Sequence, residues 1–124
     1  MKNLTIAKEQ QYTLFTPETE TLEYETLNEI QILAIADLES GQLNYVINLA
    51  NVKDFNVSLY SKLGEINQVI LKENGILVVA SLKSADHGLL KYHDIIYTKT
   101  LSEACDYIFM EEIEKGFLGD DEEE

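Results

Sequence analysis

Hydrophobic and polar positions along the chain follow two different periods. Apolar residues recur every three or four positions from Leu27 to Glu39, and again from Asn56 or Val57 to Asn74, which is the spacing of amphipathic helices. Short runs rich in β-branched and aromatic residues at Asn44–Leu49 and Ile76–Ala80 are typical of buried strands. Because a helix separates these two strands, the right-handed crossover rule predicts that they are parallel, with the helix across one face.

The first part of the chain favours a β-hairpin. Leu4–Phe15 contains two short strand-like stretches with polar residues between them, where a turn fits. The following segment, Thr16–Thr26, holds the only proline and four acidic residues. It is interpreted either as the capped start of a helix or as an acidic loop, and the pattern does not decide between them.

The last part predicts a short helix at Ala85–Tyr92, a strand at Ile95–Tyr97 and a final helix. Thr100 with Glu103 three residues later matches a capping box at the start of that helix. We expect the helix to end before Gly116. Its inward-facing residues are expected to be Leu101, Ala104, Cys105, Ile108 and Phe109.

The resulting order, ββα followed by βαβαβα, predicts an α/β fold with one layer of sheet and packed helices. With 124 residues, 45% of them hydrophobic, the chain is long enough for one core. We expect a single domain over residues 1–118 and an acidic flexible tail, GDDEEE, over residues 119–124.

The excess of acidic over basic residues makes some classes of binding partner unfavourable. The chain has 23 acidic and 9 basic residues, all of the latter Lys, for a formal net charge of −14. This charge disfavours nucleic acid and anionic membranes as partners. The sequence has no secretory leader and no apolar run near the roughly 20 residues of a membrane span, so we expect a cytoplasmic location without membrane insertion. The single cysteine, Cys105, agrees with a reducing compartment.

Catalytic and cofactor motifs are missing from the sequence. His87, His93 and Cys105 are the only His and Cys residues, and the two histidines lack the i, i+3 or i, i+4 spacing of a helical ligand pair. The glycine-rich nucleotide motifs and the G-x-S-x-G elbow do not occur. We therefore expect no metal, no cofactor and no catalytic residue, and interpret Cys105 as a small core residue.

The segment Val52–Leu63 (VKDFNVSLYSKL) connects the predicted strand Asn44–Leu49 to the predicted helix that ends at Asn74. A hydroxyl in this position lies near free backbone N–H groups, and a phosphate on Ser58 would suit the positive end of the helix dipole. In the alternative interpretation Asn56 caps the helix, and Ser58 and Ser61 are ordinary first-turn residues.

Four stretches together resemble the STAS domain family, which includes the bacterial anti-sigma factor antagonists: NYVINLANV, FNVSLYSKL, KENGILVVASL and IIYTKTLSEA. The resemblance covers most of the chain. It implies a STAS-like, small mixed sheet of about four to five strands, with four or so helices mainly on one face. In the family's antagonists a motif resembling D-S-S-G-L lies at the strand-to-helix junction, and its second serine is phosphorylated by a kinase that is also the anti-sigma factor.

Matched to that motif, Asn56 stands at the Asp, Val57 at the first Ser, Ser58 at the phosphorylated Ser and Leu59 at the Gly. The resemblance therefore implies a non-enzymatic regulator of bacterial transcription that binds an anti-sigma factor or serine kinase-like protein and is switched by phosphorylation of Ser58. The expected partner-binding residues, including the exposed start of the helix, are Asn56, Val57, Ser58, Leu59, Ser61 and Lys62.

Two other functions stay open at this stage. The same fold could serve as a constitutive scaffold or a transporter-associated module without phosphorylation, which the apolar Val57 and Leu59 favour. A small-ligand-binding or enzyme domain would need a pocket near the junction. The identity of the partner and self-association are also open.

Overall fold

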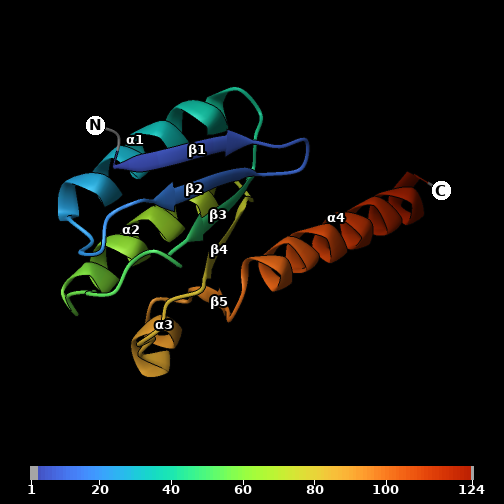
Figure 1. Ribbon diagram of the computed structural model, residues 1–124. Helices are drawn as coiled ribbons and strands as arrows, with labels where there is room; N and C mark the ends of the chain where they lie inside the picture. Colours follow the sequence, from blue (N-terminus) through green and yellow to red (C-terminus); the bar gives the residue numbers. More distant parts are fainter. Residues whose placement is uncertain (1–2, 124) are drawn as a thin grey trace.

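The computed structural model describes residues 3–123, with side chains for residues 3–116, as a five-stranded mixed sheet with four helices (Figure 1). The strands lie in the order β1-β2-β3-β4-β5; the first pair is antiparallel and the others are parallel. In chain order the elements are β1 (Leu4–Lys8), β2 (Thr13–Pro17), α1 (Tyr24–Glu39), β3 (Asn44–Asn48), α2 (Leu59–Lys72), β4 (Ile76–Ala80), α3 (His87–Tyr92), β5 (Ile96–Thr98) and α4 (Leu101–Glu123).

This element order confirms the predicted α/β fold, the hairpin and the parallel crossover. The undecided segment Thr16–Thr26 contains the end of β2, a loop and the first turn of α1, which begins at Tyr24, one turn earlier than predicted. Helix α2 begins at Leu59, slightly later than predicted, because a separate turn precedes it. The boundary expected after residue 118 stays a prediction, since the side chains from residue 117 onward lie outside the described part.

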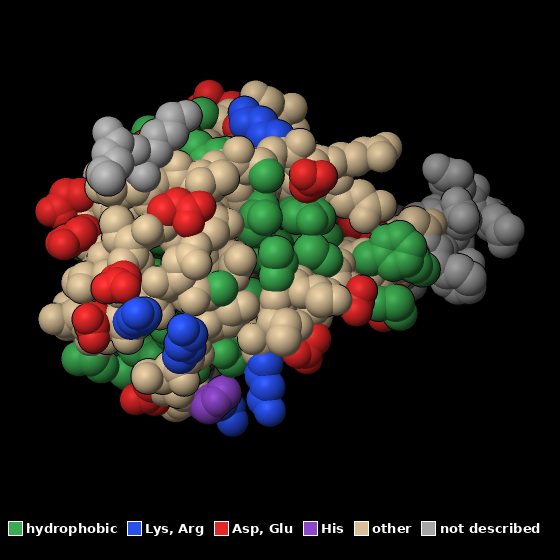
Figure 2. All heavy atoms as spheres, viewed as in Figure 1, with side chains coloured by type: hydrophobic (Ala, Val, Ile, Leu, Met, Phe, Trp, Pro, Cys, Tyr) green, Lys and Arg blue, Asp and Glu red, His purple; other side chains and the backbone are tan. Residues whose placement is uncertain are grey.

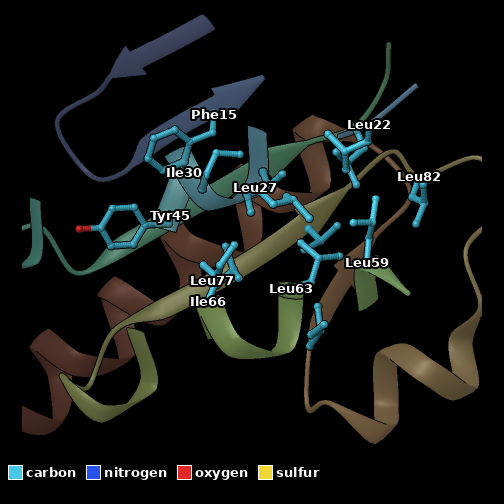
Figure 3. Packing of buried hydrophobic residues seen from close by; sticks show 14 of the residues in the cluster. Phe15, Leu22, Leu27, Ile30, Tyr45, Leu59, Leu63, Ile66, Leu77 and Leu82 are labelled. Atoms are coloured by element: carbon cyan, nitrogen blue, oxygen red, sulfur yellow. The ribbon is translucent and has the colours of Figure 1, made fainter. Parts of the chain in front are cut away.

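Each face of the sheet is covered by a different set of helices. The larger core packs α1, α2 and α3 against one face, where Tyr45 and Ile47 point (Figure 3). The smaller core packs α4 against the other face, where Val46 and Val78 point. Alternation along β3 therefore sends apolar side chains into both layers, which explains the continuous apolar run in its sequence.

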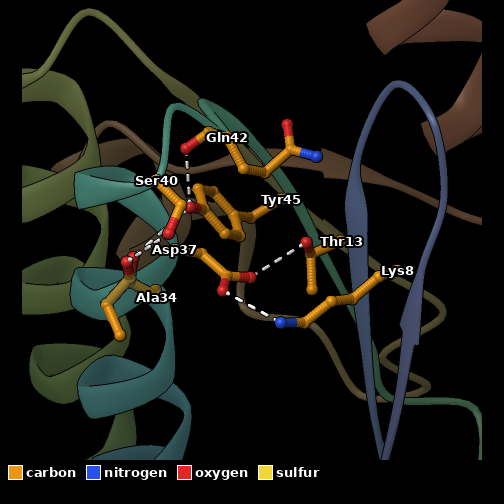
Figure 4. Close-up of polar contacts among 8 residues, drawn as sticks. Lys8, Thr13, Ala34, Asp37, Ser40, Gln42 and Tyr45 are labelled. Carbon is orange, nitrogen blue, oxygen red and sulfur yellow. Dashed lines mark hydrogen bonds and ion pairs between the residues drawn. The ribbon is translucent and has the colours of Figure 1, made fainter.

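A polar network ties the C-terminal end of α1 to the hairpin (Figure 4). The hydroxyl of Tyr45 donates to the carbonyl oxygen of Gln42 at 2.7 Å, and burial raises the pKa of this tyrosine above its ordinary value. The Asp37 carboxylate accepts from the Thr13 hydroxyl at 3.1 Å and from Lys8 Nζ at 3.3 Å. The C-terminal end of α1 is thereby joined to the β1–β2 hairpin, although the exposed Lys8 contributes little.

Helix α4 differs from its prediction in two respects. The N-cap half of the predicted capping box is confirmed, because the Thr100 hydroxyl accepts from the Glu103 N–H at 3.1 Å, while the Glu103 carboxylate accepts from the Thr100 hydroxyl at 3.2 Å. The helix then continues past Gly116 to Glu123, since glycine within a helix weakens it without necessarily ending it. The expected inward orientation of Phe109 is wrong: its side chain is 50% exposed, because Ala104 and Ile108 already occupy the sheet-facing side.

Gly64 in α2 provides a test of the packing between α2 and α3. A methyl group there would lie 2.5 Å from Nδ1 of His93, and the Asn67 side chain holds the backbone of His93 and Asp94 in place through two hydrogen bonds. We expect Gly64→Ala to lower the free energy of unfolding by about 1–3 kcal/mol, measured by urea denaturation. This reverses the usual gain of up to about 1 kcal/mol from Gly→Ala within a helix.

The matched control is Gly116→Ala, in the helix α4. Within the described part of the chain, no atom outside the helix's own backbone and the adjacent residues lies within 4 Å of a methyl group added at Gly116, so this variant should not lose stability. Equal effects of the two substitutions would contradict the described contact between Gly64 and His93.

Candidate functional site

The junction between β3 and α2 is fixed on both sides by buried or paired residues. Val52 is buried, and the ring of Phe55 meets the ring of Tyr60 edge-to-face at 4.9 Å between centroids. The Tyr60 hydroxyl accepts the backbone N–H of Asp86 at 2.8 Å, which links the start of α2 to the start of α3. The exposed residues between these anchors are therefore presented by a well-packed base.

Asn56 organises the turn that presents Ser58. Its side-chain oxygen accepts the Ser58 N–H at 2.9 Å, and its carbonyl oxygen accepts the Leu59 N–H at 2.9 Å. Ser58 occupies the N-cap position of α2, yet its side chain makes no capping hydrogen bond. Since Asn56 already satisfies the backbone N–H of Ser58, the hydroxyl of Ser58 is not needed to build the turn.

The six predicted partner-binding residues separate into two groups. Asn56, Val57, Ser58 and Ser61 are exposed, with Val57 at 62%. Leu59 and Lys62 were expected on the exposed start of the helix, but both are buried, at 6% and 5% exposure. Leu59 packs in the larger core (Figure 3), so the bulky residue at this motif position does not cover the junction.

Lys62 is buried because its ammonium group finds partners between α1 and α2. Nζ donates to Asn28 Oδ1 at 3.1 Å, to Gln31 Oε1 and to Glu65 Oε2 at 2.8 Å. Burial alone lowers the pKa of Lys62, but the hydrogen bond to Glu65 and the neighbouring Tyr24 together raise the pKa above the ordinary value of lysine. The residue thus stays charged and joins the two helices beneath the junction.

Tyr24 is a surface residue of this region that the sequence did not single out. Its ring lies 5.0 Å from Lys62 Nζ, and its side chain is 53% exposed at the start of α1. Because the pattern left Thr16–Thr26 undecided, no sequence signal brought Tyr24 near α2. A nearby parallel bridge between Thr21 and Asp54 also places the loop before α1 beside the junction.

The other reactive side chains do not converge. The His87 ring contacts Tyr97 at 5.6 Å, His93 lies against Tyr92, and Cys105 Sγ donates to the Tyr12 hydroxyl at 3.2 Å. Among residues 3–116, whose side chains are described, no group of three or more His, Cys, Asp or Glu residues is placed to hold a metal ion. None of the helices within residues 3–123 has the length and apolarity required to span a bilayer.

Comparison with solved structures places this arrangement in a known class of fold. A serine-to-glutamate variant of RsbS from Moorella thermoacetica superposes with a TM-score of 0.68 at 15% identity, over 86% of this chain and 95% of that one. An anti-sigma factor antagonist from Mycobacterium paratuberculosis gives a TM-score of 0.65 at 14% identity, over 85% and 92% of the two chains.

An anti-sigma-factor antagonist (STAS) domain protein from Planctomyces limnophilus gives a TM-score of 0.61 at 18% identity, over 83% of this chain and 96% of that one. No protein-family model and no curated protein sequence matches the chain. The fold is therefore that of the STAS-domain proteins and anti-sigma factor antagonists, which confirms the fold implied by the sequence resemblance.

The contact between Lys62 and Glu65 should affect the pKa of the Glu65 carboxyl and the stability of the fold at low pH. The hydrogen bond from Lys62 lowers the pKa of Glu65 below 4.5, the ordinary value of a glutamate carboxyl, with a further contribution from Gln31. A carboxyl with a lowered pKa adds stability above its unfolded pKa, and this stability is lost as pH falls through the folded pKa. We expect carbon-detected NMR titration to place the Glu65 midpoint below 4.5.

In Lys62→Met, the Glu65 midpoint should rise towards 4.5, because the hydrogen bond and the positive charge are gone. Lys72→Met, at the other end of α2, is the control and should leave the midpoint unchanged. A Glu65 midpoint insensitive to Lys62→Met would refute the described pairing.

Proposed function

We propose that this chain is a non-enzymatic regulatory module of the anti-sigma factor antagonist type, which acts in the cytoplasm by binding an anti-sigma factor or serine kinase-like protein. The binding surface is the junction around Ser58, and phosphorylation of Ser58 switches it. The observation that carries the proposal is the exposed hydroxyl of Ser58 at the N-cap of α2, in a turn that Asn56 holds without it.

The exposed residues around Ser58 suit a protein contact. Val57 and Tyr24 are large, exposed side chains near the start of α2, and such residues are the usual anchors of an interface core. Asn56 and Ser61 supply polar groups at the edge of the surface. The buried Lys62 is not part of the exposed surface; it stabilises the surface by joining α1 to α2.

A phosphate on Ser58 would change this surface electrostatically. It adds roughly −1.5 to −2 charges at pH 7, in the middle of the contact, to a chain whose net charge is already −14. The dipole of α2 tolerates this charge at the start of the helix, so the fold persists while the docking surface is altered. Phosphorylation therefore releases the partner without unfolding the module.

The structural neighbours support this proposal through their descriptions as anti-sigma factor antagonists, and one is a serine-to-glutamate variant. A second function, constitutive binding by the same surface, is favoured by the 62% exposure of Val57. An apolar residue at that position suits a lasting contact better than one that cycles with phosphorylation.

The two functions are separated by quantitative affinity purification of the tagged chain from its native cells. We expect Ser58→Ala to retain a kinase-like partner and Ser58→Asp to lose about tenfold or more of it, because the new charge lies in the contact. The control is Ser61→Asp, which adds the same charge on the next exposed position of the helix and should have a smaller effect.

Retention of the same partner by all three variants would overturn the switch and assign the constitutive function. The variant Val57→Asp tests both functions, because both place the contact at this residue. If Val57→Asp captures every partner as well as the unsubstituted chain does, both functions are overturned.

A further inference from the structure

Helix α4 has apolar residues on two opposite sides. Ala104 and Ile108 are buried against the sheet, at 0% and 1% exposure. Phe109, Met110 and Ile113 form a second group, here named the α4 stripe, with exposures of 50%, 55% and 48%. A helix lying on the surface of a domain normally presents polar residues on its outer side, so the stripe departs from the usual pattern.

The three residues of the α4 stripe form one surface. Phe109 and Ile113 are four positions apart and Met110 and Ile113 are three apart, and residues with these spacings are neighbours on a helix. Ile113 follows the buried Ile108 by five residues, which turns it by about 140° away from the sheet. Figure 1 shows α4 projecting beyond the sheet, and Figure 2 shows apolar side chains exposed on that side of the molecule.

The charges around the α4 stripe decide what would cover it. Exposed Asp106 lies one turn before Phe109 and Met110, and exposed Glu114 lies one turn after Met110. The sequence of α4 has nine Asp or Glu residues and one Lys. A second copy of this chain would set these carboxylates against carboxylates, whereas a basic surface would be attracted.

We propose that the α4 stripe is a second docking site, which takes the apolar side of a Lys- and Arg-rich amphipathic helix of another protein. Phe109 and Ile113 supply the apolar contact, and the carboxylates beside them pair with the basic flanks of that helix. This interaction is additional to the proposed function at Ser58.

The two surfaces lie on opposite layers of the molecule. The start of α2 belongs to the layer that covers Tyr45 and Ile47, and α4 belongs to the layer that covers Val46. A partner on the α4 stripe therefore does not compete with one at the junction. Ser58→Asp should leave binding at the α4 stripe unchanged, which keeps the two proposals separately testable.

The test uses a fluorescently labelled 18-residue Leu/Lys peptide, designed as an amphipathic helix, titrated with the full chain. We expect binding that weakens as salt is raised, and at least about tenfold weaker binding of the matched Leu/Glu peptide. The double variant with Phe109→Gln and Ile113→Gln should bind the Leu/Lys peptide about tenfold more weakly than the unsubstituted chain. Its melting temperature should not fall, because both side chains are exposed.

The matched control combines Ile32→Gln and Ile35→Gln, which replace two exposed isoleucines of α1 at 59% and 40% exposure. This control should bind the Leu/Lys peptide within about twofold of the unsubstituted chain, since it leaves the α4 stripe intact. Equal binding by all three chains would overturn the proposal in favour of attraction to net charge alone. A dimer in sedimentation equilibrium that only the α4 double variant abolishes would also overturn it, in favour of a second copy.

Discussion

Burial of β3 and β4 on both faces is the constraint on which the rest of the fold depends. The two strands pair in parallel over their full length, from Asn44 opposite Ile76 to Asn48 opposite Ala80, and every residue of β4 is buried. Strands buried in this way need a layer on each side and a crossover between them. Helices α1 and α2 supply one layer and α4 supplies the other.

The same constraint positions the candidate site. A crossover helix must begin beyond the carboxyl end of the strand before it, so the start of α2 lies at an edge of the sheet where neighbouring loops meet. Asn56 forms the turn there, Tyr60 fastens the helix to α3, and Lys62 fastens it to α1. Ser58 can remain exposed because the hydrogen bonds of these neighbours, and not its own hydroxyl, hold the junction together.

Elements with strong local patterns could be predicted from the sequence. The bounds of β4 are as predicted, and Thr100 caps α4 through the Glu103 N–H as the spacing of the two residues indicates, because these signals depend on neighbouring residues only. The burial of Lys62 could not be predicted, since its partners Asn28 and Gln31 lie more than 30 positions away. The inward orientation of Phe109 was predicted wrongly, because helical periodicity does not show how many residues around the helix the sheet covers.

An acidic molecule that exposes apolar residues at the junction and on the α4 stripe is suited to selective contacts with other proteins. The net charge of −14 opposes non-specific association, while Val57 and Tyr24 on one layer and the α4 stripe on the other offer local apolar contact. The fold of the structural neighbours is compatible with such a role, because it builds a stable base that needs none of these exposed side chains.

The most direct test of the switch at Ser58 is peptide mass spectrometry of the chain isolated from its native cells, with co-purifying proteins identified in the same sample. The account predicts a phosphate on Ser58 in part of the population, and a kinase-like partner bound only to the unmodified part. An unmodified Ser58 throughout, with the same partner bound to the native chain and to Ser58→Ala, would contradict it.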